Sequence, residues 1–287
     1  MFSRLLKHEW KASAGLLGIL SLAIFGIGVA GTVILRVLVN YEIERDLLST
    51  DATMLEILAT AAMGMFLFFS VIALSVYLIA VQFILLYRFY KNKFTDEGYL
   101  TFTLPVKTTQ IFWSSFVNIF LWLLIAVAVV AVIVFMAVLF GTGTDSLINT
   151  DVFKGMSEVF DIFSDMTWAD IFGEAEEVIY VVLMVLQLLV TPFYALFIPM
   201  CCITMGAVLA KKHKILAAFG MYYAVNFVVG IISSVATIVP SLFLLGNGNE
   251  ELYLMVSSGV EVFVTAALTL CSYFLTIHLM KRKLNLP

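Results

Sequence analysis

The stretch Ile111–Phe140, "IFWSSFVNIFLWLLIAVAVVAVIVFMAVLF", contains no charged residue. A helix needs about 20 predominantly apolar residues to cross the hydrocarbon core of a bilayer. This run exceeds that length, so it predicts a membrane-spanning helix that is tilted or that protrudes from the bilayer. One such run already indicates an integral membrane protein.

The composition of the whole chain points the same way. Of its 287 residues, 62% are hydrophobic and 13% are charged, whereas soluble domains average about 45–50% apolar and about 25% charged residues. Three cysteines occur without C-x-x-C spacing, so the sequence predicts neither a disulfide framework nor a zinc site.

Five further runs have the length and apolarity of a membrane span. The predicted spans are approximately residues 16–39, 63–87, 111–140, 178–209, 215–239 and 258–279. The first is too long for the apolar part of a secretory signal peptide, so we expect it to be retained. The sequence therefore predicts an all-α integral membrane protein with six transmembrane helices in a single domain, residues 1–287.

The basic residues predict the orientation of these spans. An even number of spans leaves both termini on one side, and 13 of the 16 Lys and Arg residues fall on that side. Only Arg36, Arg45 and Lys154 fall on the other. Because cytoplasmic loops carry the excess of Lys and Arg, we expect both termini to be cytoplasmic. The expected location is the cytoplasmic (plasma) membrane, with the lipid bilayer as a partner and no nucleic acid.

The long connection between the third and fourth spans contains an amphipathic segment, residues 151–175. Phe153, Met156, Phe160 and Phe163 are spaced by three, four and three residues, which places them on one face of a helix. Its polar positions are acidic, unlike the basic polar faces of helices that bind anionic lipid. Two interpretations stay open: a cover over the outer ends of the spans, or an outer lid over a substrate path.

Catalytic and nucleotide-binding motifs are missing from the sequence. It contains no G-x-x-x-x-G-K-[ST], H-E-x-x-H or G-x-S-x-G. We therefore expect a chain that is not an enzyme and that binds no cofactor or metal of its own.

A few polar residues lie inside the predicted spans. Asn118, Gln187 and Asn226 are candidates for a translocation path, although hydrogen bonds between helices are the ordinary explanation for such amides. Arg36 and Glu261 are close enough to an interface to extend toward water.

A polar segment, Phe94–Thr109 or "FTDEGYLTFTLPVKTT", separates the second and third spans. Thr95 suits a helix N-cap, and the two acidic residues after it suit a first helical turn. The residue before Pro105 is biased against helical geometry, so a short helix is expected over Asp96–Thr103. Its apolar and aromatic surface suits the groove of a partner protein; a connector that rests on the lipid headgroups is the alternative.

This segment resembles the loop between spans two and three of ABC exporter permeases of the type-two class. The resemblance rests on Glu97, Gly98, Leu100, Leu104, Pro105 and Val106. The N-terminal "MFSRLLKHEWK" is similar to the amphipathic helix that lies on the cytoplasmic face before span one in that family.

The resemblance implies an exporter subunit that works with a separate ABC ATPase, which would bind ATP and Mg, and with a second permease subunit, either identical or related. The short helix would be the coupling helix, and Lys91 and Lys93 would steer the ATPase. The residues predicted to couple are Phe94, Thr95, Asp96, Glu97, Gly98, Tyr99, Leu100, Phe102 and Leu104.

The family also tends to fold the chain between spans five and six back into the outer leaflet. Residues 239–256 suit this, because Pro240 and the turn Gly246–Asn249 would break them into two short pieces. The cargo stays open between peptide, lipid and antibiotic-like molecules. A non-catalytic membrane sensor or immunity protein is the main alternative function, and an intramembrane enzyme is a further one.

Overall fold

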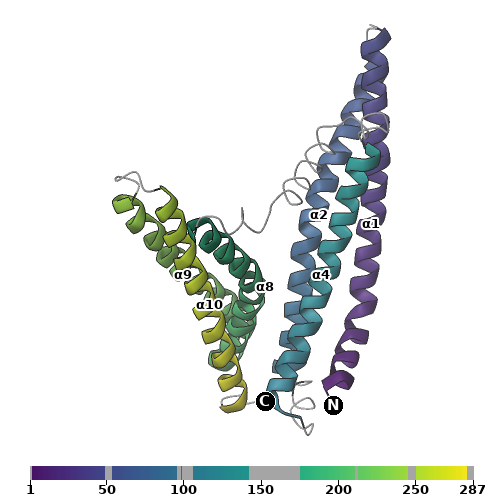
Figure 1. The fold of residues 1–287 in the computed structure, drawn as a ribbon. Coiled ribbons are helices and arrows are strands. Elements are labelled where there is room, and N and C mark those ends of the chain that lie inside the picture. The colour runs from purple at the N-terminus through teal and green to yellow at the C-terminus, as the bar shows by residue number, and fades with distance from the viewer. Residues whose placement is uncertain are drawn as a thin grey trace. The chain divides into compact units, whose positions relative to one another are not determined.

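The computed structural model describes residues 2–48, 54–95, 98, 106–141, 175–210, 213–244 and 250–282. Within these ranges every long regular element is an α-helix (Figure 1). The helices are α1 (Phe2–Leu48), α2 (Met54–Phe94), α4 (Thr108–Gly141), α8 (Ala175–Leu209), α9 (Lys214–Leu244) and α10 (Glu250–Arg282). The amphipathic segment expected over residues 151–175 lies almost wholly outside the described residues.

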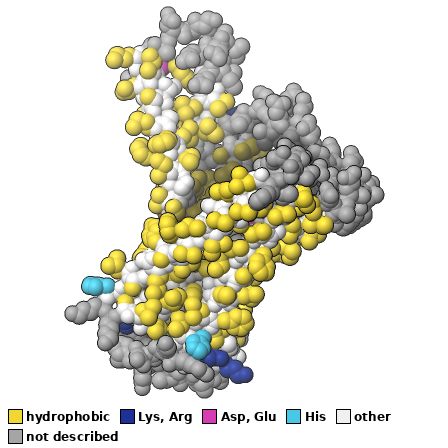
Figure 2. Space-filling view, turned by 90° about the vertical axis from the view of Figure 1, so that its left-hand side faces the viewer, with side chains coloured by type: hydrophobic (Ala, Val, Ile, Leu, Met, Phe, Trp, Pro, Cys, Tyr) yellow, Lys and Arg dark blue, Asp and Glu magenta, His cyan; other side chains and the backbone are white. Residues whose placement is uncertain are grey.

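Among the described residues, six helices are long and apolar enough to cross a membrane, and each contains one of the predicted spans. Helices suit this environment because every backbone hydrogen bond is made inside the segment, where lipid offers no partner. Figure 2 shows hydrophobic side chains over most of the described surface of the face it draws. Such a continuous apolar surface is far larger than the patches of soluble monomers. The fold is that of an all-helical, multi-pass membrane protein.

The expected break at Pro240 is wrong, and the N-terminal segment is helical as expected. Residues Phe2–Lys11 form the first part of α1, which continues into the predicted first span without a break. No proline interrupts it, and Gly15 is tolerated inside the helix. In the same way, α9 runs through Pro240 to Leu244, because a single missing N–H does not end a helix in a membrane protein.

The chain divides by contact into two units. Unit 1 contains residues 1–85 and 117–163, and unit 2 contains residues 86–116 and 164–287, so the division falls inside α2 and α4. These units are groupings by contact, and the single permease domain over residues 1–287 stays a prediction.

In unit 1, α1 contacts both α2 and α4. The hydroxyl oxygens of Ser21 and Tyr77 are 2.7 Å apart and form a hydrogen bond between α1 and α2. Trp10 of α1 stacks on Trp122 of α4, with ring centroids 4.8 Å apart. Aromatic stacking and one hydroxyl pair therefore join the three helices of this unit.

In unit 2, α8 packs against both α9 and α10. A small residue permits a close approach of α8 to α9. A Cβ atom on Gly206 of α8 would lie 2.6 Å from the backbone nitrogen of Ala218 in α9. Small residues allow such close backbone contact between membrane helices, so Gly206 sets how tightly the α8–α9 hairpin closes.

We predict that Gly206→Ala destabilises the protein although alanine is the better helix former. Overpacking of a tight contact costs about 1–3 kcal/mol, against a gain in helix propensity of about 1 kcal/mol. Gly220→Ala in α9 is the matched control, because nothing lies within 4 Å of its Cβ position. Thermal unfolding in detergent should show a lower Tm for the first variant and an unchanged or higher Tm for the second. Equal Tm values for the two would contradict this account.

Candidate functional site

The predicted coupling segment begins at a buried residue. Phe94 ends α2 with 3% of its side chain exposed. Its ring meets that of Phe89 edge to face, with centroids 5.7 Å apart, and stacks on Tyr90. Phe94 therefore packs within the chain in this structure, which suits a residue that anchors the segment rather than one that touches a partner.

The chain turns immediately after α2. The Thr95 hydroxyl donates to the carbonyl of Lys91, in the last turn of the helix. The carbonyl of Thr95 accepts a hydrogen bond from the N–H of Gly98 at 2.8 Å, and Gly98 is buried. This turn is compatible with a short helix after Thr95. The other predicted coupling residues, namely Asp96, Glu97, Tyr99, Leu100, Phe102 and Leu104, lie outside the described residues.

The two lysines expected to steer a partner differ in exposure. Lys91 is exposed, whereas only 2% of Lys93 is accessible. A charged group buried to that extent requires polar partners inside the protein. Of the two lysines, only Lys91 is exposed at the surface.

The chain returns to the membrane at the start of α4. The carbonyl of Lys107 accepts hydrogen bonds from the N–H groups of Gln110, at 2.8 Å, and of Ile111, at 3.3 Å. The residues that follow are buried at once, with 1% of Ile111 and none of Phe112 exposed. Both ends of the segment between α2 and α4 are therefore fixed in packed structure.

The first part of α4 is held by an aromatic cluster from three helices of unit 2. Its members are Phe112, Trp113 and Phe116 of α4, Phe193 and Phe197 of α8, and Tyr273 of α10. Ring centroids are 4.8 Å apart for Phe116 and Phe197, and 5.4 Å for Phe112 and Phe197. Offset and edge-to-face pairs at these distances add about 0.5–1.5 kcal/mol each beyond the burial of area.

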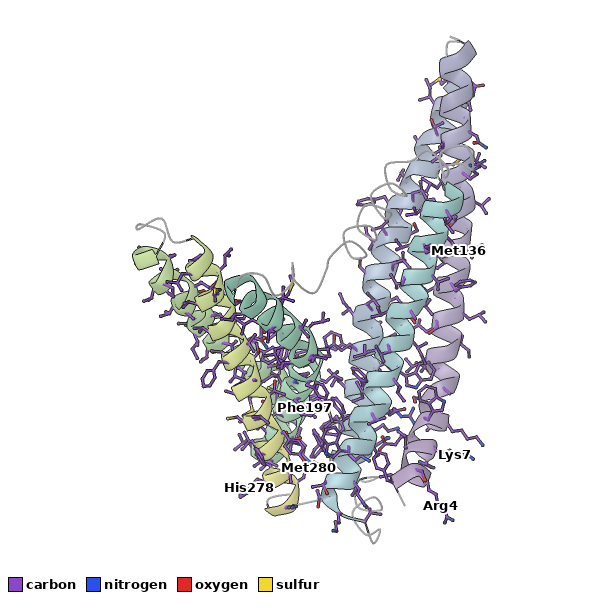
Figure 3. All side chains as sticks on the ribbon, in the orientation of Figure 1. Arg4, Lys7, Met136, Phe197, His278 and Met280 are labelled. Atoms are coloured by element: carbon purple, nitrogen blue, oxygen red, sulfur yellow. The ribbon has the colours of Figure 1, made fainter. Side chains whose placement is uncertain are left out.

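Tyr273 adds a polar contact to the aromatic cluster. The indole Nε1–H of Trp113 donates to its hydroxyl oxygen at 3.4 Å, and its ring stacks on Phe197 with centroids 5.8 Å apart. Phe197, labelled in Figure 3, is 5% exposed and contacts rings from both α4 and α10. Phe197 is thus the central residue of the cluster.

Of the three residues predicted to line a path, Asn118 is buried in unit 1. Only 4% of it is exposed, and its Oδ1 lies 3.4 Å from the hydroxyl of Ser13, which donates to it. In this structure Asn118 joins α4 to α1. That matches the ordinary explanation of an amide inside a span.

The other two path candidates, in unit 2, make different contacts. The Nδ2 of Asn226 donates to the carbonyl of Tyr222 at 2.8 Å within α9. The Nε2 of Gln187 in α8 donates to Oε1 of Glu261 in α10 at 3.4 Å. Among the described residues, Gln187 and Asn226 have no hydrogen-bond partner in common. A translocation path lined by them stays a prediction.

Sequence reasoning missed two features of this site. The first is the aromatic cluster, which the spacing of Phe112 with Phe116, and of Phe193 with Phe197, could have suggested as paired faces. The second is the link from Gln187 to Glu261, because nothing local shows which turns of α8 and α10 meet. Within the described ranges no group of three His, Cys, Asp or Glu could hold a metal ion.

Comparison with known proteins does not assign the chain to a family. No family model matches it, and no curated protein or solved structure matches it either.

We predict that Phe197→Ala strongly destabilises the protein, because it removes the central ring of the aromatic cluster. Truncation of a buried Phe costs about 3–5 kcal/mol. Phe227→Ala in α9 is the matched control, since that side chain is 70% exposed. Thermal unfolding in detergent should show a large fall in Tm for the first variant only.

Tyr273→Phe separates ring packing from hydrogen bonding, because it keeps the ring and removes only the acceptor of the Trp113 N–H. Its effect on the free energy of unfolding should be about 0.5–1.5 kcal/mol.

A similar fall in Tm for Phe197→Ala and Phe227→Ala would show that the aromatic cluster is not a packed core.

Proposed function

We propose that this chain is the permease subunit of an ABC exporter, which moves a peptide, lipid or antibiotic-like cargo with ATP hydrolysed by a separate subunit. The observation that carries the proposal is the polar segment between α2 and α4, whose sequence resembles the coupling loop of type-two permeases. Its flanks, Phe94 and Ile111, are buried, as a segment that transmits force requires.

The proposed mechanism uses the contacts of unit 2. The last part of α2 and the first part of α4 belong to this unit together with α8, α9 and α10. A push on the segment between α2 and α4 would therefore reach α8 and α10 through the aromatic cluster. Close-packed cores pass on such displacements because they hardly compress. The ATPase would supply the energy, with ATP and Mg bound there.

The proposed orientation follows from the distribution of charge. The described Lys and Arg residues of unit 2 lie at or near helix ends: Arg88, Lys91 and Lys93 close α2, Lys107 precedes α4, Lys214 opens α9, and Lys281 and Arg282 close α10. Arg4 and Lys7 lie at the start of α1 (Figure 3). With the positive-inside rule, these ends and both termini face the cytoplasm of a cell whose plasma membrane holds the protein. A second permease subunit, identical or related, completes the proposed assembly.

We predict that Tyr99→Ala weakens binding to an ATPase that copurifies with the wild-type chain. Loss of an aromatic anchor from an interface costs about 2 kcal/mol or more, which is roughly a 30-fold loss of affinity. Extraction from native membranes in mild detergent, followed by quantitative mass spectrometry, measures the partner retained. Wild-type protein should carry an ATPase with a P-loop in near one-to-one amount, and the variant should lose most of it.

Tyr223→Ala is the matched control, because this tyrosine of α9 is 71% exposed in a predicted span. It should keep the ATPase at the wild-type level. A wild-type chain that purifies without any ATPase would contradict the exporter proposal and favour the non-catalytic sensor or immunity protein. An intramembrane enzyme would instead hydrolyse or transfer its substrate when purified alone.

A further inference from the structure

Three polar side chains meet where α8 contacts α10: Gln187, Glu261 and Thr265. Gln187 Nε2 donates to Glu261 Oε1 at 3.4 Å, and the Thr265 hydroxyl lies 3.4 Å from Gln187 Oε1. We call these three residues the α8–α10 polar cluster. It belongs wholly to unit 2.

The amide of Gln187 lies between the other two side chains, 3.4 Å from each. The Thr265 hydroxyl has its shorter contacts inside its own helix, with the carbonyls of Glu261 at 2.8 Å and Val262 at 3.0 Å, and it lies on the side of the amide oxygen. The amide N–H group is therefore turned toward the carboxylate. A carboxylate offers about four acceptor positions, and Gln187 occupies one of them. Glu261 is exposed, so the remaining positions face outward.

No cationic side chain balances this carboxylate in the part of the chain that the structure describes. Among those residues, Glu261 forms no ion pair with Lys, Arg or His. The nearest basic residue described on its own helix toward the C-terminus is His278, followed by Lys281. Between Glu261 and Lys281 the helix rises by about 30 Å at ~1.5 Å per residue, which is about the thickness of a hydrocarbon core. Glu261 thus lies near the opposite membrane boundary from Lys281.

The surface around the α8–α10 polar cluster is apolar. Met184 and Leu188, which flank Gln187 on α8, are 61% and 74% exposed. At the membrane boundary an exposed carboxylate can extend toward water and the lipid headgroups, where it is open to a ligand's donor groups. An ammonium group compensates a carboxylate best, through charge-assisted hydrogen bonds. An apolar chain attached to it would cover Met184 and Leu188.

We propose that the α8–α10 polar cluster binds the ammonium group of an amphiphile, with Glu261 as the acceptor and Gln187 and Thr265 as positioning residues. The amine has two possible sources, a bilayer lipid with a primary-amine headgroup or an amine-bearing cargo. The site is defined by unit 2 alone and does not depend on an ATPase partner.

Carbodiimide labelling tests the site directly. Dicyclohexylcarbodiimide is an apolar reagent that reaches carboxyl groups from the membrane and converts them into a stable N-acylurea, which peptide mass spectrometry locates. The full chain in phosphatidylcholine vesicles should be labelled at Glu261, because choline has no N–H to donate. Dodecylammonium should suppress the labelling at concentrations about tenfold lower than dodecanol, which has the same chain without the charge.

Two variants and one change of lipid complete the test. Glu261→Gln should lose the label, and Thr265→Val, which frees the Gln187 amide, should need more dodecylammonium for the same protection. Protection when phosphatidylethanolamine is added to the vesicles identifies a lipid ligand. Protection by dodecylammonium without protection by that lipid identifies a cargo amine. Equal protection by dodecanol and dodecylammonium, or a Glu261 that is never labelled, would overturn the proposal, whether or not an ATPase copurifies.

Discussion

The contact of Phe116 with Phe197, with ring centroids 4.8 Å apart, is the interaction on which the proposed coupling depends. It joins the first part of α4 to the middle of α8, and Tyr273 extends the same cluster to α10. Rings suit this task in a membrane because lipid provides no hydrophobic drive toward helix association, so close packing has to provide the attraction. A large planar side chain supplies many contacts while it loses little conformational freedom. The segment before α4 is therefore attached to a stiff part of the protein.

Polar side chains contribute to the fold in a different way. Many described Ser and Thr hydroxyls bond to a carbonyl of their own helix, as Thr204 does to Met200 and Thr276 to Ser272. This pattern satisfies the hydroxyl locally and joins nothing else. Hydrogen bonds between side chains of different helices therefore show which helix faces meet, as with Ser13 and Asn118 or Gln187 and Glu261. The second of these pairs is exposed, and it is the one that suggests a ligand.

Much of the fold follows from local sequence. Apolar length alone predicts the spans, since hydropathy depends on composition and needs no knowledge of neighbours. Helix ends are less accessible to this reasoning: α2 starts at Met54 rather than near residue 63, because good helix formers continue past the apolar run. The burial of Phe94 and Lys93 and the pairing of Gln187 with Glu261 depend on how distant helices pack, which no local pattern encodes. The proposed ATPase partner comes from the resemblance of the loop sequence, because the packing of the helices does not indicate which protein would bind there.

Site-specific photo-crosslinking at position 99 tests the central claim most directly. A benzophenone amino acid would replace Tyr99, and cells that naturally make the protein would produce this variant and be irradiated. The same amino acid at position 223 is the control. The account predicts a covalent adduct between position 99 and a protein that carries a P-loop, and no such adduct at position 223. Adducts with lipid alone at position 99, or the same proteins at both positions, would contradict it.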